Sequence, residues 1–221
     1  MLRLINQLLE FRKMQNNKLA LSLEETDVMG FLHEIFLSFK DTAASKNMDF
    51  RFQPSVASYK MFIDKGNLDK VGYNLLSNAF KYTDNGKSIT VTLKEENNWL
   101  ILQVSDTGAG IPINKQGKVF ERFYQIESQH IGSGIGLSLV QRLVELHHGQ
   151  ITLVSEVGKG STFSIYIPQD KSVYTAEELA ESKGEMEEQR VYSTNAHEVY
   201  TDDVETEAVN KRREAGMEQF L

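Results

Sequence analysis

Two glycine clusters constrain this chain more than any other feature of its sequence. "DTGAGI" occupies residues 106–111, and "GSGIGLSLV" occupies residues 132–140. Asp106 stands where a strand-like segment ends, and Gly108 and Gly110 beside it carry no Cβ, so a flat ligand can approach the backbone closely. The sequence therefore predicts a pocket with a single carboxylate at its edge.

The two clusters differ in the chemistry that they favour. The Asp106 carboxylate only accepts hydrogen bonds, which suits an exocyclic amine such as the one on adenine. Gly132, Gly134 and Gly136 lead into "IGLSLVQRLVELHHG", where the N–H groups at the start of a helix attract phosphate. One cluster suits a base and the other its phosphates. The pattern is neither a Walker motif nor a Rossmann fingerprint.

Composition and charge exclude several classes of protein. The 221 residues contain no Cys, which excludes a disulfide framework and thiolate metal sites. No run of 18 apolar residues occurs, so this segment is expected to be soluble. The net charge is −7, and residues 171–221 carry 13 acids and 6 bases, whereas residues 1–170 carry 18 of each. Because residues 1–170 carry no excess of positive charge, no nucleic acid is expected as a partner.

Hydrophobic periodicity divides the chain into three parts, residues 1–22, 23–168 and 169–221. The first part predicts a helix over about residues 2–19, whose apolar face needs a partner, as in a helical hairpin or coiled coil. The last part has sparse apolar residues and many acids, which is typical of an acidic extension or flexible linker.

The middle part mixes helical and strand patterns. Asp27 is a candidate N-cap for a helix over residues 28–47, and a second helical pattern covers residues 67–82. Strand patterns occur at residues 48–53, 60–64, 88–96 and 99–106, and as a hairpin over 149–168. The fold class predicted from these elements is a two-layer α/β sandwich, with a mixed β-sheet of about five strands packed on about three helices.

Four motifs in a fixed order resemble the boxes of sensor histidine kinases. "NLLSNAFKYT" at residues 74–83, "DTGAGI", "FERFYQ" at residues 120–125 and "GSGIGLSLV" follow the order of the N, first glycine, F and second glycine boxes. Residues 23–168 thus resemble the ATP-binding catalytic domain of that family, within the GHKL (Bergerat) superfamily. The resemblance implies a protein histidine kinase of a bacterial two-component system, with ATP and Mg²⁺ as cofactors.

The resemblance gives each residue of the N box a role. Asn78 resembles the magnesium-coordinating Asn, and Asn74, one helical turn earlier on the same face, resembles its companion near the phosphates. A hard cation such as Mg²⁺ takes oxygen ligands and is shared with substrate phosphates. Lys81 resembles the lysine that contacts the phosphates, and Tyr82 resembles the aromatic residue that lines the base pocket. Asn74, Asn78 and Lys81 are the expected catalytic residues.

The other boxes complete the expected site. Asp106 resembles the Asp that recognises adenine, and Ser161 matches a hydroxyl position of the family pocket. Residues 112–133 resemble the mobile lid, in which Phe120 and Phe123 would dock against the body. The residues expected to bind ATP are Asn78, Lys81, Tyr82, Asp106, Gly108, Gly110, Ile111, Arg122, Gly132, Gly134, Gly136, Leu137 and Ser161.

Two features depart from the family pattern. Gln125 stands where some members have an Arg after the aromatic pair of the F box, so Arg122 is the candidate lid cation. His33 in "HEIF" imitates the start of the H box but lacks its Arg-Thr-Pro continuation, so we interpret it as a residue of the domain's first helix. The phosphoaccepting histidine is therefore expected outside this sequence, in a dimerisation domain whose last helix residues 1–22 resemble.

Two alternative functions stay open. Hydrolysing members of the superfamily carry a Glu at the first N-box position as general base, whereas this chain has Asn74, whose amide cannot take a proton from water. An ATP-hydrolysing conformational ATPase is one alternative. A non-catalytic dimerisation or docking module is the other.

The resemblance also implies partners and a location. The expected partners are the dimerisation and phosphoacceptor domain of the same protein and the receiver domain of a response regulator, with a homodimeric parent protein. The domain is expected to be cytoplasmic, with the parent anchored in the inner membrane. By analogy with hybrid kinases, the acidic segment after Pro168 is expected to lead to a receiver domain.

Overall fold

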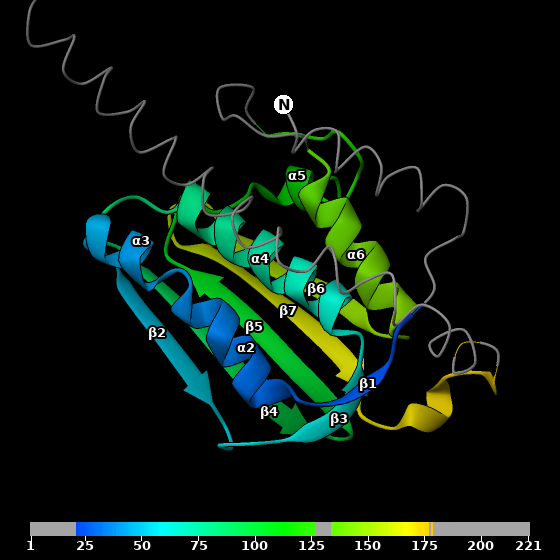
Figure 1. Ribbon diagram of the computed structural model, residues 1–221. Coiled ribbons are helices and arrows are strands. Elements are labelled where there is room, and N and C mark those ends of the chain that lie inside the picture. Colours follow the sequence, from blue (N-terminus) through cyan, green and yellow to red (C-terminus); the bar gives the residue numbers. More distant parts are fainter. Residues whose placement is uncertain (1–20, 127–133, 177, 179–221) are drawn as a thin grey trace, which may run out of the picture.

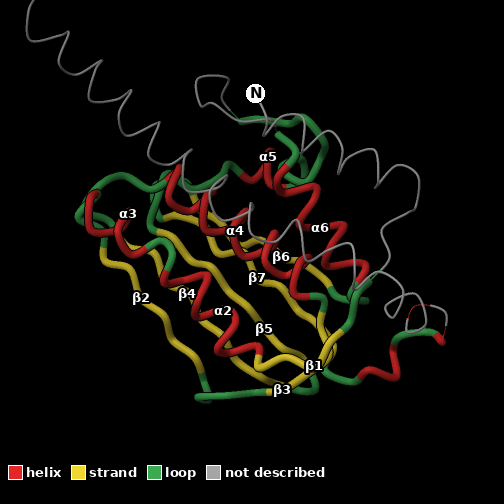
Figure 2. Tube along the Cα trace, viewed as in Figure 1, coloured by secondary structure: helices red, strands yellow, loops and turns green. Residues whose placement is uncertain are grey.

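The structure is a computed structural model that describes residues 21–126, 134–176 and 178. Within them a five-stranded mixed sheet carries three longer helices on one face (Figures 1 and 2). The sheet order is β2 (Asp49–Pro54), β4 (Ser88–Glu96), β5 (Trp99–Asp106), β7 (Gly160–Pro168) and β6 (Gln150–Glu156). The helices are α2 (Val28–Leu37), α4 (Lys65–Tyr82) and α6 (Gly136–Leu146). The predicted two-layer α/β sandwich is confirmed.

Alternation along the strands places the core between the sheet and the helices. In β4, Ile89, Val91 and Leu93 are buried, while the residues between them are partly exposed. Strand residues alternate between the two faces of a sheet, so this pattern buries one face under the helices. β2 pairs parallel with β4, and the other neighbours in the sheet pair antiparallel.

Shorter elements complete the described chain. They are β1 (Glu24–Asp27), β3 (Lys60–Ile63), α3 (Lys40–Ser45), α5 (Ile113–Gln116) and a 3-10 turn, η1 (Lys171–Val173). β1 and β3 pair antiparallel and form a separate two-stranded sheet. The sequence pattern indicates β3 as part of the main sheet and does not indicate β1, because the β1 residues "EETD" include no apolar residue.

The first predicted helix is interrupted. The pattern over residues 28–47 indicated one helix from Asp27, but α2 ends at Leu37 and α3 begins at Lys40. Phe39 between them is fully buried and stacks on Phe80, with ring centroids 5.4 Å apart, so core packing determines the break. The helix expected over residues 2–19 lies outside the described residues.

His33 and Trp99 pack against other aromatic residues of the domain. His33 lies on α2 and stacks on Phe52 at 4.9 Å. Trp99 meets Tyr166 edge-on at 6.4 Å across β5 and β7. His147 and His148 directly follow α6. Among the described residues, no helix is long and apolar enough to cross a lipid bilayer.

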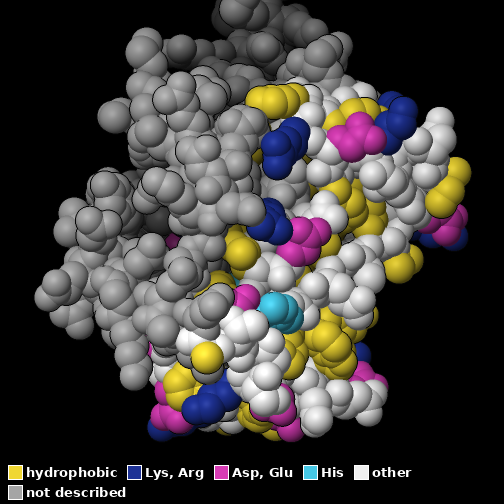
Figure 3. All heavy atoms as spheres, turned by 90° about the vertical axis from the view of Figure 1, so that its right-hand side faces the viewer, with side chains coloured by type: hydrophobic (Ala, Val, Ile, Leu, Met, Phe, Trp, Pro, Cys, Tyr) yellow, Lys and Arg dark blue, Asp and Glu magenta, His cyan; other side chains and the backbone are white. Residues whose placement is uncertain are grey.

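The two ends of the described chain meet beside α6. Leu21 and Leu23 form a small buried cluster with Tyr174, against which Leu146 packs. Tyr174 lies beyond Pro168, so packed structure continues past the boundary predicted for the domain. Figure 3 faces this side of the molecule and shows charged side chains of both signs interspersed with apolar ones.

His147 is a buried histidine that the fold holds neutral. Its Nδ1 donates to the Leu143 carbonyl oxygen at 2.8 Å, and its Nε2 accepts the Asp64 N–H at 3.3 Å. Burial lowers its pKa below the usual range, against the raising effects of the Leu143 bond and the Asp64 charge. A proton on Nε2 would face the Asp64 N–H, so the fold has no place for the imidazolium.

We expect acid to destabilise the fold through His147. The unfolded chain takes up a proton below about pH 6.5 and the folded chain does not, so the free energy of unfolding falls as pH falls, by at most about 1.4 kcal/mol per pH unit from this group. His147→Gln keeps an acceptor for the Asp64 N–H but cannot titrate, and should flatten this dependence. Urea unfolding between pH 7.5 and 5.5 measures it, with His148→Gln at the exposed neighbour as control. An unchanged slope in His147→Gln would contradict this assignment.

Candidate functional site

Three side chains form a row across one end of the main sheet. In the strand register, Asp106 of β5 lies opposite Ser161 of β7, and Ser161 lies opposite Ser155 of β6. All three share the face that carries the helices, because they continue the alternation of buried residues such as Val104 and Phe163. At this end of the sheet the apolar core residues are therefore followed by three polar side chains.

The Asp106 carboxylate is held by backbone donors. Its Oδ1 accepts the Gly108 N–H at 2.8 Å and the Ser161 N–H at 3.3 Å. Burial raises the pKa of Asp106 above its usual range, although these two hydrogen bonds and the charge of Lys87 oppose the shift. A partly buried carboxylate with one oxygen already bonded leaves Oδ2 to accept a donor from a ligand, since no other group of the described residues donates to it.

The first glycine cluster brings the Asp106 loop against its surroundings. A Cβ on Gly108 would overlap the carbonyl oxygen of Tyr82, and one on Gly110, whose φ is +69°, would overlap the carbonyl of Glu156. Ala109 N–H donates to the Tyr82 carbonyl at 3.2 Å and fixes the same contact. These close approaches require residues without side chains, so the loop lies flat between α4 and the β6–β7 turn.

Thr83 is a pocket residue to which the sequence analysis gave no role. Its hydroxyl is buried and has no hydrogen-bond partner in the described part of the chain. A Cβ on Gly108 would lie 3.0 Å from this hydroxyl and 2.8 Å from Asp106 Oδ1, so both oxygens border the same space. A buried polar atom without a partner costs free energy, which a ligand or a water molecule here would recover. Because Thr83 ends the N-box motif, the sequence did contain a signal for it.

The N-box face of α4 meets the second glycine cluster. Asn74 is buried, its Nδ2 donates to the Lys70 carbonyl at 2.7 Å, and a Cβ on Gly136 would come within 2.7 Å of its Oδ1. Asn78, one turn further along the same face, is half-buried, and its amide has no hydrogen-bond partner among residues 21–126 and 134–176. The structure therefore brings Asn74 against the start of α6, with Asn78 one turn further along the same face of α4.

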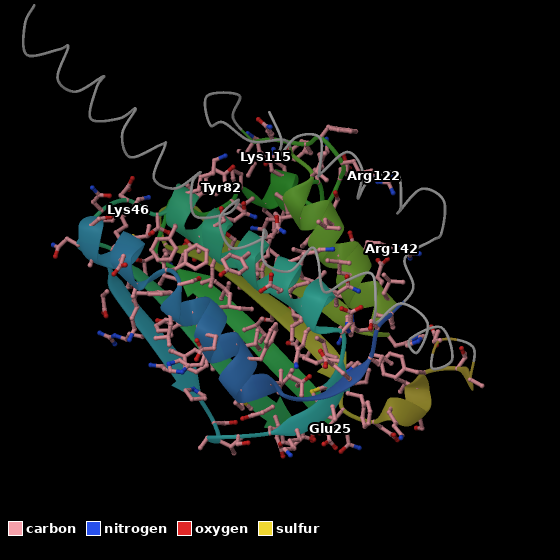
Figure 4. The ribbon with its side chains drawn as sticks, viewed as in Figure 1. Glu25, Lys46, Tyr82, Lys115, Arg122 and Arg142 are labelled. Atoms are coloured by element: carbon pink, nitrogen blue, oxygen red, sulfur yellow. The ribbon has the colours of Figure 1, made fainter. Side chains whose placement is uncertain are left out.

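The end of α4 carries the next two predicted residues. Lys81 Nζ lies 5.3 Å above the centre of the Tyr82 ring, and Tyr82 is exposed. Figure 4 shows Tyr82 at this end of α4 and Arg122 on the segment after α5. Leu137 and Ile111 pack partly buried against the core cluster.

The predicted lid is described only in part. Phe120 packs on the core and meets Phe163 edge-on at 6.3 Å, as expected, but Phe123 is 61% exposed, so the expectation that it docks against the body is wrong. Its backbone is left-handed, with φ of +62°, and its N–H donates to the Gly134 carbonyl at 2.9 Å. Gly132 lies outside the described residues. Arg122 is exposed, and its role stays a prediction.

The donor set suits a metal that is shared with a ligand. Among the described residues, no group of three or more His, Asp or Glu side chains could hold a metal ion. A single amide oxygen at Asn78, one turn from the Asn74–Gly136 contact, resembles the sparse protein ligation of Mg²⁺ bound mostly by phosphates and water. The residues present therefore fit a magnesium-bound nucleotide.

Comparison with known families agrees with this geometry. Residues 63–171 match the family described as histidine kinase-, DNA gyrase B-, and HSP90-like ATPase. Residues 63–171 therefore form a domain of this ATPase family. Within it, the described domain is the ATP-binding catalytic domain of the sensor histidine kinase type, as the order of the four boxes predicted.

Individual relatives are longer than this chain. Histidine kinase P4 of Formosa agariphila is 34% identical over 175 residues, which cover 76% of this chain and 13% of that protein. Full-length ShkA in complex with AMPPNP superposes with a TM-score of 0.69 at 26% identity, over 75% of this chain and 35% of that one. ThkA in complex with the response regulator protein TrrA gives 0.65 at 22% identity, over 78% and 49%, and shows the fold alone.

We expect Gly108→Ala to destabilise the domain. Its Cβ would overlap the Tyr82 backbone carbonyl, which cannot move aside without shifting α4, at a cost of about 2 kcal/mol in the free energy of unfolding. Gly117→Ala is the matched control, because φ there is −68° and nothing lies within 4 Å of its Cβ. Chemical denaturation of both variants measures the difference. Equal stabilities would show that the loop does not lie against α4.

Proposed function

We propose that this chain is the catalytic ATP-binding part of a two-component sensor histidine kinase, which holds Mg-ATP so that its γ-phosphoryl group is attacked by a histidine of a dimerisation domain. The observation that carries the proposal is the meeting of two sites at one end of the fold: the Asp106 row of the sheet, and the N-box face of α4 at the start of α6.

The base is assigned to the Asp106 side of the pocket. Asp106 Oδ1 is engaged by the Gly108 and Ser161 N–H groups, so Oδ2 accepts a hydrogen from the exocyclic amine of adenine. The glycine loop lets the ring lie close to the backbone, and the unpartnered Thr83 hydroxyl supplies a further polar contact. Tyr82 lies next to this loop through its carbonyl.

The phosphates are assigned to the opposite side, where α6 begins. The free N–H groups in the first turn of α6 would donate to the phosphates. Lys81 adds a positive charge, and Asn78 offers its amide oxygen to the metal. When bound, Mg²⁺ neutralises charge on the transferring phosphoryl group. Asn74 lines the same face, but an amide does not take a proton from water, so the site positions ATP and does not activate water.

We also propose the partners and the setting. A dimerisation domain of the same protein supplies the histidine, within a homodimer, and the receiver domain of a response regulator takes the phosphoryl group onward. ThkA, a histidine kinase of the same fold, forms a complex with the response regulator protein TrrA, which supports a response regulator as partner. We further propose residues 1–22 as the end of the dimerisation hairpin, 169–221 as an acidic extension, and an inner-membrane anchor in the parent protein, with this domain in the cytoplasm.

Calorimetric titration with ATP tests the assignment of the base. Asp106→Asn keeps a carbonyl oxygen for the Gly108 and Ser161 N–H groups but places an NH₂ group where the adenine amine donates, so ATP affinity should fall at least about tenfold. Asn78→Ala should bind ATP equally with and without Mg²⁺, whereas the wild type binds more tightly with it. Asp49→Asn on β2, an exposed carboxylate paired with Arg51, is the control. Wild-type affinity in Asp106→Asn would contradict the pocket.

Hydrolysis separates the kinase from the conformational ATPase. Because Asn74 stands at the position of the general base, we expect phosphate release by the wild type far below the ~1 s⁻¹ at which kinases begin to turn over. A coupled phosphate assay measures this rate. Any activity that is the same in the wild type and in Asp106→Asn comes from a contaminating ATPase. A rate near ~1 s⁻¹ that Asp106→Asn abolishes would favour the hydrolysing alternative.

A further inference from the structure

Ser155 is a polar residue of the sheet end to which neither the sequence motifs nor the proposed ATP contacts give a role. Its hydroxyl lies within hydrogen-bond distance of three groups. It accepts the Ile111 N–H at 2.8 Å, donates to the Gly160 carbonyl oxygen at 2.9 Å, and lies 2.9 Å from the Ser161 hydroxyl oxygen. Ser155 thus joins the glycine loop, the β6–β7 turn and the row that contains Asp106.

Counting hydrogens fixes the direction of the bond between the two serines. A serine hydroxyl has one hydrogen to donate and two lone pairs that accept. All three contacts of Ser155 can be hydrogen bonds at once only if its single hydrogen goes to the Gly160 carbonyl, which can only accept, and Ser161 donates to Ser155. The Ser161 hydroxyl therefore presents only lone pairs to the pocket.

We propose that Ser155 is a specificity-determining residue of the nucleotide pocket. Because Ser155 takes the hydrogen of the Ser161 hydroxyl, Ser161 can only accept hydrogen bonds from a nucleotide. This inference rests on the proposed function. Asp106 Oδ2 and Ser161 Oγ then form a pair of acceptors on neighbouring strands. An exocyclic amine, which carries two hydrogens, suits such a pair, whereas the carbonyl oxygen of a 6-oxopurine has no hydrogen to give and meets two acceptors.

Gln116 supports the arrangement from α5. Its Nε2 donates both hydrogens to backbone carbonyls at 2.8 Å, one to Ile111 and one to Ser155. The side chain thereby fixes the glycine loop and the end of β6 relative to each other, and connects them to the first helix of the predicted lid. Gln116 acts on the pocket through Ser155 and Ile111, so it is a positioning residue.

The experiment compares ATP with inosine triphosphate, which carries an oxygen where ATP carries the amine. Titrations of the wild type and Ser155→Ala give the ratio of the two dissociation constants. A general loosening of the pocket weakens both nucleotides alike and cancels in the ratio, whereas a freed Ser161 hydroxyl can donate to the oxygen and changes it. Ser155→Thr, which keeps a hydroxyl and suits a strand, is the conservative variant.

We expect Ser155→Ala to reduce the preference for ATP by about tenfold, which is the usual effect of one well-placed hydrogen bond. Ser155→Thr should restore it. Gln116→Glu, which has the same shape but no hydrogens for the two carbonyls, should weaken both nucleotides alike. Ser164→Ala is the matched control, since it removes a similar serine from a Gln103–Ser164 hydrogen bond of 3.0 Å on the other face of the sheet.

Two results would overturn the inference. An undiminished preference for ATP in Ser155→Ala would show that Ser155 does not set the acceptor. Hydrogen exchange without nucleotide tests the contact between Ser155 and Ile111 itself. The Ile111 amide should exchange at least about tenfold faster in Ser155→Ala than in the wild type. Equal exchange rates in the two proteins would show that the contact does not form. A wild type that bound neither nucleotide would refute the proposed function and the selectivity with it, while the exchange result would still report on the contact.

Discussion

The buried carboxylate of Asp64 is the interaction on which the rest of the structure depends. It is 1% exposed, caps α4 by accepting the Asn67 N–H at 2.9 Å, and accepts the Ser22 N–H at 2.9 Å. Its own N–H donates to His147 at the end of α6. A buried carboxylate is tolerated only when such donors replace water. One residue therefore fixes the start of α4, the end of α6 and the segment that enters the domain.

The opposite end of α4 is fixed by its backbone. The Tyr82 carbonyl accepts the Ala109 N–H, and Gly108 packs against the same oxygen. Because α4 also carries Asn74 and Asn78, its placement determines how far the proposed phosphate side lies from the proposed base side. Burial at one end and close backbone contact at the other hold this helix as a rigid spacer between the two halves of the pocket.

Sequence reasoning located the site better than it located the supports of the site. The positions of Asp106, Asn74 and Asn78 followed from boxes whose chemistry is visible in single residues. Ser155 and Thr83 escaped because a serine or threonine in a strand or at a helix end is ordinarily a surface or turn residue. Only residues distant in sequence give Ser155 its partners and bury the Thr83 hydroxyl. Phe123 was expected to dock because residues 112–133 resemble the family's lid, but its side chain is exposed and its backbone is left-handed.

The sequence by itself determined most of the elements of this protein and the residues of its candidate site. Alternation in β4 and β5, the glycine clusters and the order of the four boxes are local patterns, and local sterics and hydrogen bonding are sufficient to interpret them. Only the tertiary structure decided that the Ser155 and Ser161 hydroxyls meet, that the helix over residues 28–47 breaks at Phe39, and that Tyr174 packs with Leu21 and Leu23. These outcomes depend on contacts between residues far apart in the chain, whose free energies no single segment contains.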